Sequence, residues 1–123
     1  MTNSETIAGQ GLAEATIMLK ALADTNRLQI LDVLMQGDSC NCELTERLGL
    51  PPNLLSHHLR ILRETGLVSS RRDTIDGRWI YYTVNRDAVA AWRAWFAVFL
   101  NPDRIQTRPI LCGPEGQQTI ELT

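Results

Sequence analysis

The chain lacks the features that mark a membrane or secreted protein. Its 123 residues contain no run of about 18 apolar residues, which excludes a transmembrane helix. The first five residues (MTNSE) are polar and have neither the basic start nor the apolar core of a secretory signal. We therefore expect a cytoplasmic protein with no membrane partner.

Cysteine, glycine and proline are also scarce. The 3 Cys are an odd number, which in a cytoplasmic chain argues against a disulfide framework and for free thiols, metal ligands or redox chemistry. The composition of 8 Gly, 5 Pro, 44% hydrophobic and 21% charged residues excludes collagen, low-complexity and disordered chains. The length predicts one domain with a modest core.

Lysine occurs only once, and charge is unevenly distributed along the chain. Residues 1–46 carry seven acidic and two basic side chains, whereas residues 47–108 carry ten Arg and five acidic side chains, within a net charge of −2. The guanidinium fork of Arg fits phosphate oxygens and guanine edges. The second half of the chain therefore predicts a nucleic-acid-binding surface, the alternative being ordinary solvated charges.

Four segments carry apolar residues at three- and four-residue steps, which predicts four amphipathic helices. Gly37, Gly49 and Gly66 follow the last three of them, and glycine is the preferred residue just beyond a helix end. The segments are residues 12–22, 26–35, 41–48 and 53–65.

Two segments rich in strand formers, residues 67–72 and 79–84, follow these helices. Asp76 and Gly77 between them predict a β-hairpin. Asn85 then suits the N-cap of a fifth helix over residues 86–100. This order predicts a mainly α, winged helix-turn-helix fold with a two-stranded β-hairpin. We expect a DNA-binding and dimerisation domain over residues 1–100 and a C-terminal arm over residues 101–123 that carries Cys112.

The fifth helix is apolar around nearly its whole circumference. Such a helix must be buried on several sides, and in a chain of this size the second partner is a further copy of the chain. We therefore predict a homodimer formed by the first and last helices. The predicted interface residues are Leu12, Leu19, Trp92, Trp95, Phe96 and Phe99.

The fourth helix predicts a surface that reads DNA. Its polar residues recur at three- and four-residue steps on one face, while Leu55, Leu59 and Leu62 take the opposite face. A stripe of short donors that ends in Arg suits the major groove. We assign Arg71 and Arg72 of the hairpin to phosphate contacts. The predicted reading face consists of Asn53, Ser56, His57 and Arg60.

The chain resembles, motif by motif, the ArsR/SmtB family of metal- and metalloid-responsive repressors. This resemblance implies a homodimeric repressor that releases double-stranded operator DNA when an inducer ion binds. It also implies that Arg78, at the hairpin tip, reaches the minor groove or phosphates. The matching segments are residues 22–31 (LADTNRLQIL), 40–44 (CNCEL), 56–62 (SHHLRIL), 66–68 (GLV) and 76–82 (DGRWIYY).

Cys40 and Cys42 match the cysteine motif of the arsenite-responsive members. Inside a helix, side chains two residues apart point roughly 200° apart and cannot share an ion. With Glu43 as the third residue of a capping box, however, Cys40 is the N-cap, lies outside the helix proper and can turn toward Cys42. The helix dipole there would favour the thiolate, which is the form that binds soft ions.

Trivalent arsenic prefers three thiolates, and Cys112 is the one remaining cysteine. The arsenite sensors of the family often carry a third cysteine where this chain has Thr45. Other members use C-terminal cysteines. The zinc site that the family builds from His and carboxylates on the last helix is absent, because residues 86–100 contain no His and a single acid, Asp87. We therefore predict As(III) or Sb(III) as the inducer at Cys40, Cys42 and Cys112, with no cofactor required.

Two alternatives remain open at this point, and a third is disfavoured. The inducer ion could be Cd, Pb or Bi, which also favour thiolates. The three cysteines could instead form a redox switch through disulfides. A thiol enzyme using Cys42 with His57 or His58 is disfavoured, because the sequence shows no oxyanion device and no third orienting group.

Overall fold

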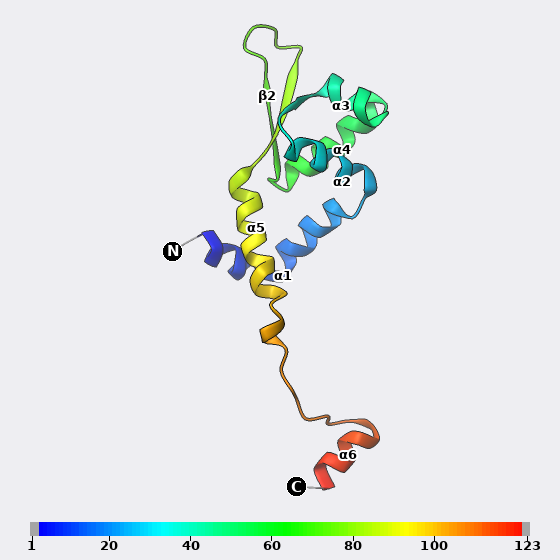
Figure 1. Cartoon of the computed structure of the whole chain (residues 1–123), viewed down its shortest axis with the longest axis vertical. Coiled ribbons are helices and arrows are strands. Elements are labelled where there is room, and N and C mark those ends of the chain that lie inside the picture. Colours follow the sequence, from blue (N-terminus) through cyan, green and yellow to red (C-terminus); the bar gives the residue numbers. More distant parts are fainter. Residues whose placement is uncertain (1–2, 122–123) are drawn as a thin grey trace.

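The computed structural model describes the backbone of residues 3–121 and the side chains of residues 11–117. It contains the helices and both hairpin strands that the sequence predicts, with boundaries that differ by a few residues except at the start of α1 (Figure 1). The elements are α1 (Asn3–Leu22), α2 (Thr25–Met35), β1 (Ser39–Cys40), α3 (Asn41–Leu48), α4 (Pro52–Glu64), β2 (Val68–Arg72), β3 (Ile80–Val84), α5 (Arg86–Phe99), the 3-10 helix η1 (Pro102–Arg104) and α6 (Gly113–Glu121).

Local capping explains where the central helices begin and end. Asn85 accepts a hydrogen bond from the backbone N–H of Ala88 at the start of α5, and Gly49 takes a left-handed conformation at the end of α3. Helix α1 begins at Asn3, nine residues earlier than predicted, and bends at Gly11, whose φ of 65° is favourable only for glycine. Two helical segments therefore meet in a kink at Gly11, and the second begins at Leu12, where the sequence predicts the first helix to begin.

The core lies between α2, α3, α4 and the sheet. Its most deeply buried large side chains are Leu55, Leu59 and Leu62 of α4 together with Ile30 and Leu44. All three α4 leucines are those predicted to face inward. Because this inner face holds α4 in place, the opposite face of α4 is presented to solvent.

The sheet has three strands, not the two that were predicted. Strand β1 pairs with β3, so that the order is β1-β3-β2, with all pairs antiparallel. Two residues are too short to give a periodic signal in the sequence, and β1 is stabilised by hydrogen bonds to a strand that lies about forty residues away. The loop between β2 and β3 spans residues 73–79 and is longer than the tight turn that an Asp-Gly pair suggests.

The C-terminal arm leaves the rest of the chain after α5. Figure 1 shows it running away from the other helices, with α6 at its far end. Helix α6 and the short η1 lie in this arm, for which the sequence analysis identified no helix. The division into residues 1–100 and 101–123 stays a prediction.

None of the helices between residues 3 and 121 combines the length and the apolar character that crossing a bilayer requires.

Candidate DNA interface and thiol site

Helix α4 presents the predicted reading face to solvent. Asn53, Ser56, His57 and Arg60 are all exposed, and Nη2 of Arg60 lies 3.3 Å from Nδ1 of His57. No side chain caps the start of α4, because Pro51 occupies that position, as the sequence indicated. The first N–H groups of the helix are thus left without a capping side chain.

His58 lies on the inner side of α4 and connects it to α2. The ring is buried, with 5% of its surface exposed. Nη1 of Arg27 donates to its Nδ1 over 3.1 Å, and its Nε2 lies 3.5 Å from Nδ2 of Asn26. Burial lowers the pKa of His58, an effect that nearby Asp24 opposes and Arg27 reinforces. His58 therefore accepts a bond from Arg27 and has a structural role between α2 and α4.

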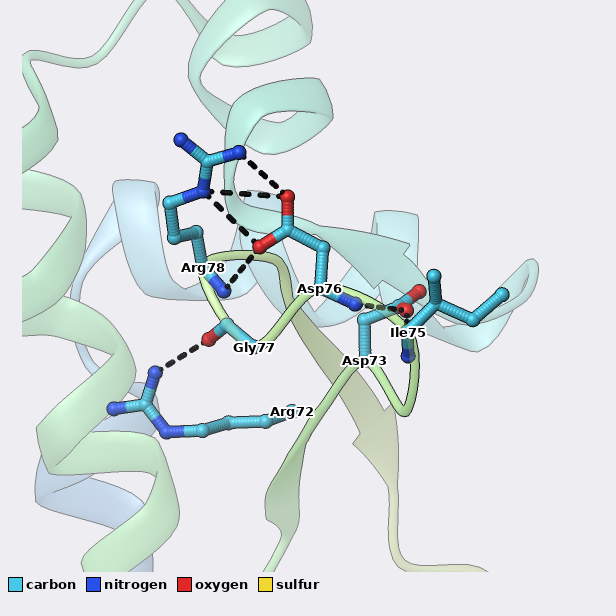
Figure 2. Close-up of polar contacts among 6 residues, drawn as sticks. All are labelled: Arg72, Asp73, Ile75, Asp76, Gly77 and Arg78. Carbon is cyan, nitrogen blue, oxygen red and sulfur yellow. Dashed lines mark hydrogen bonds and ion pairs between the residues drawn. The ribbon is translucent and has the colours of Figure 1, made fainter.

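The loop between β2 and β3, which we call the wing tip (residues 73–79), has an ordered network of its own (Figure 2). The carboxylate of Asp76 accepts hydrogen bonds from Nε and Nη2 of Arg78 over 3.0 and 2.8 Å. This arginine lowers the pKa of Asp76. Nη1 of Arg72 donates to the carbonyl of Gly77 over 2.7 Å. Two of the three predicted wing arginines are thus held at the tip, and all three are exposed.

Asp73 organises the wing tip, and the sequence analysis did not identify it. Its carboxylate accepts bonds from the N–H groups of Ile75 and Asp76 over 2.7 and 3.0 Å and from the hydroxyl of Tyr81 over 2.6 Å. The Tyr81 hydroxyl and these two amides lower the pKa of Asp73. The signal that could have found it is the preference of Asp for bonding to N–H groups two or three residues further on, at the start of a turn.

The two cysteines at the start of α3 lie in contact. Cys40 is the N-cap, and its Sγ accepts a bond from the N–H of Glu43 over 3.4 Å. The Sγ atoms of Cys40 and Cys42 are 2.8 Å apart, and both cysteines are free thiols. The N-cap geometry predicted from the sequence is therefore present, and it brings the sulfur atoms together.

The pKa of the Cys42 thiol is raised, which contradicts the expectation that the helix start would favour its thiolate. The hydrogen bond with Cys40 is the main cause, followed by desolvation and by the charge of Cys40. The N–H groups of Cys42 and Glu43 act in the expected direction but are weaker. Two thiols this close disfavour ionising together.

Cys112 does not join this pair in the described structure. It is exposed and directly precedes α6 in the chain, and Figure 1 shows α6 far from α3. Among the residues with described side chains, no three His, Cys, Asp or Glu are placed to hold one metal ion. A role for Cys112 as third ligand thus requires movement of the arm or a second copy of the chain, and it stays a prediction.

The predicted dimer residues divide into two groups. Trp92 and Phe96 are partly buried against the core of their own chain, and their place in an interface stays a prediction. Leu12, Leu19 and Phe99 are exposed. A hollow of about 590 Å³ lies between α1 and α5, and we call its lining the α1–α5 hollow: Gly11, Leu12, Ala94, Trp95, Val98, Phe99 and Arg104.

Known proteins resemble this chain over the same elements. Residues 24–70 match the protein family described as "Bacterial regulatory protein, arsR family". The transcriptional activator HlyU of Vibrio cholerae is 39% identical over 79 residues, which cover 64% of this chain and 70% of HlyU. The arsenical resistance operon repressor of Staphylococcus aureus is 39% identical over 72 residues, covering 58% of this chain and 66% of the repressor.

The solved structure of reduced HlyU from Vibrio cholerae shares the fold. It superposes with a TM-score of 0.57 at 34% identity, and the match covers 71% of this chain and 90% of that structure. The winged helix-turn-helix and the sequence relatives lead to the same conclusion. The chain belongs to the ArsR family of bacterial regulatory proteins, and it is a DNA-binding transcription regulator and not an enzyme.

Proposed function

We propose that the chain is a homodimeric repressor that binds operator DNA and is released when trivalent arsenic or antimony binds to the thiolates of Cys40 and Cys42, with Cys112 as third ligand. The observation that carries the proposal is the 2.8 Å contact between the first two sulfur atoms at the start of α3. Helix α3 directly precedes α4 in the chain. An ion bound there therefore acts next to the reading face.

The chemistry of the donors supports a soft inducer. Bonds from a metal to thiolate sulfur are about 2.3 Å long, so the two sulfurs need to move apart only slightly to bind one ion. An all-thiolate set selects soft ions, among which Cd, Pb and Bi are alternatives to arsenic and antimony. The arsenical resistance repressor among the relatives supports arsenic. The regulator needs no cofactor for this function.

The arrangement of α4 and the wing supports DNA binding by two copies. We infer that Asn53, Ser56, His57 and Arg60 enter the major groove while Arg71, Arg72 and Arg78 contact phosphates or the adjacent minor groove. In a dimer the two α4 helices would lie about 34 Å apart, which is one turn of DNA. The exposed apolar lining of the α1–α5 hollow supplies the surface for that dimer.

Arginines of α4 and of the hairpin should contribute differently to DNA binding. Arg60→Ala should weaken the best operator by about 1–3 kcal/mol and relax sequence preference, because a base contact is lost. Arg71→Ala should weaken specific and random DNA alike and make the dependence of log affinity on log salt shallower by about one unit, because one phosphate contact is lost. Fluorescence anisotropy with operator and scrambled duplexes at several salt concentrations measures both.

Arg93→Ala is the matched control for this pair, since Arg93 is exposed on α5 and lies on neither surface. It should leave affinity and salt dependence unchanged. Equal effects of Arg60→Ala and Arg71→Ala on both duplexes would show that the reading face is wrongly assigned.

Arsenite without any oxidant should release the regulator from its operator. The measurement is an anaerobic gel shift in which arsenite, antimonite, Cd, Pb and Bi are added separately to the complex. Release by arsenite or antimonite at the lowest concentration supports the proposal. Release by Cd, Pb or Bi at lower concentrations would show that arsenic and antimony are the wrong inducers, while the thiol site would stand.

A redox switch is a second candidate, which the contact between the two thiols favours. Oxidation of Cys40 and Cys42 would form one S–S bond, with two protons and two electrons passing to an oxidant such as a peroxide. A related structure is described as reduced HlyU. Release by peroxide, with no release by arsenite in the anaerobic assay, would favour this candidate.

A further inference from the structure

The thiol pair and the wing are joined by a row of three side chains across the sheet. In the strand register Cys40 of β1 is opposite Tyr81 of β3, and Arg71 of β2 is opposite Tyr81 on the other side. Directly paired residues point to the same face of a sheet. The next row confirms which face this is, because Ser39 and Tyr82 are buried in the core.

Tyr81, at the centre of the row, contacts the wing in two ways. Its ring carries the guanidinium of Arg71, with Cζ 4.7 Å from the ring centroid. Its hydroxyl donates to Oδ2 of Asp73 over 2.6 Å. The same carboxylate holds the N–H groups of Ile75 and Asp76.

These bonds continue to the end of the wing. Asp76, whose N–H is held by Asp73, binds the guanidinium of Arg78 through two nitrogens. A continuous set of contacts therefore runs from Tyr81 through Asp73 and Asp76 to Arg78, while Arg71 is contacted directly. Two of the three wing arginines are reached from this one tyrosine.

Cys40 has two structural roles at once, and they link the thiol pair to the sheet. It caps α3 through its sulfur, and its backbone belongs to β1. If the sulfur of Cys40 turns toward an ion that it shares with Cys42, it loses the hydrogen bond from the N–H of Glu43. The change in the backbone at Cys40 then acts on its strand partner Tyr81 as well as on α3.

We infer that Tyr81 is a positioning residue that couples the state of the Cys40–Cys42 pair to the placement of Arg71 and Arg78. The inference rests on the proposed function for its inducer and its DNA contacts. It adds a second route of regulation, from β1 through β3 to the wing, beside the route from α3 to α4. Its elements are a strand pair, a cation–π contact and a hydrogen-bonded turn.

The first test observes the tyrosines without DNA. The sequence contains 2 Tyr, so that protein labelled with ¹³C-tyrosine has two sets of ring signals, which Tyr81→Phe and Tyr82→Phe assign. Adding arsenite until the thiols of Cys40 and Cys42 no longer react should shift the Tyr81 signals more than those of Tyr82. Joining the two thiols in a disulfide should do the same. Unmoved Tyr81 signals in both treated samples would overturn the inference.

The second test compares operator affinity with and without arsenite in the full-length protein. Tyr81→Phe keeps the ring under Arg71 but loses the bond to Asp73. It should weaken operator binding about fivefold and reduce the ratio of the two dissociation constants by about the same factor. Tyr82→Phe, on the buried face of the same strand, should keep both within about twofold of wild type.

The double variant Tyr81→Phe Asp73→Asn makes the route specific. If the Tyr81 hydroxyl acts through Asp73, the double variant should bind operator no more weakly than Asp73→Asn alone. A loss of affinity equal to the product of the two single losses would overturn that route. If the ratio of operator dissociation constants with and without arsenite is the same in Tyr81→Phe as in wild type, the coupling is overturned. Wild-type protein that does not respond to arsenite but shifts its Tyr81 signals on disulfide formation would refute the proposed inducer and retain the coupling.

Discussion

Changing both Cys40 and Cys42 to Ser is expected to leave operator binding at the wild-type level and to abolish release by arsenite. Serine is a good N-cap, so the start of α3 is retained, whereas a hydroxyl is a poor ligand for a soft ion. In wild type, inducer binding that favours the free form by about 2–3 kcal/mol raises the dissociation constant about 30-fold or more. The double variant should show no rise.

Anisotropy of a labelled operator, with and without arsenite, measures this effect. The single variants Cys40→Ser and Cys42→Ser should behave like the double variant, because each removes one of the two adjacent sulfurs. Cys112→Ser should weaken the response without abolishing it, since two thiolates and an external third ligand can still hold the ion. Full release of the double variant by arsenite would refute the site.

A glutamate in the α1–α5 hollow is expected to disrupt the dimer and with it tight operator binding. Val98 lines the hollow and is 68% exposed in the single chain. In a dimer Val98→Glu would bury a carboxylate in a mostly apolar interface, which is strongly unfavourable. Because two linked half-sites bind together far more tightly than one, operator affinity should fall by about 100-fold or more.

Sedimentation at micromolar concentration and operator binding test this prediction together. Ala97→Glu is the matched control, because Ala97 is the neighbouring exposed residue of α5 but does not line the hollow. It should remain a dimer and bind operator normally. A wild-type chain that sediments as a stable monomer would refute the dimer and leave the apolar lining of the hollow without an explanation.

The exposed polar face of α4 and the contact between the two thiols could both be predicted from the sequence because they are local. Asn53, Ser56, His57 and Arg60 are spaced by the helical period, and the inward leucines of α4 determine which side remains outside. The N-cap position of Cys40 follows from Glu43 three residues later. Each of these depends on hydrogen bonds or spacings within a few residues.

The pKa of Cys42 and the partners of the α5 aromatics could not be obtained in this way. The first depends on how closely two sulfur atoms approach, which the helix start permits but does not require. The second depends on which side of α5 lies against the core: Trp92 and Phe96 pack there, and Val98 does not. A helix that is apolar on nearly every side contains no signal for this choice.

The amino-acid sequence was sufficient for the family, the order of the five main helices and the hairpin, the exposed polar face of α4 and the cysteine motif, because periodicity, caps and short motifs are short-range properties. Tertiary structure alone placed Cys40 opposite Tyr81 and Arg71, and it alone joined the carboxylate of Asp73 to the hydroxyl of Tyr81. The pairing of β1 with β3 joins segments about forty residues apart. Its register depends on how the whole core packs, and two residues of strand are too few to encode it.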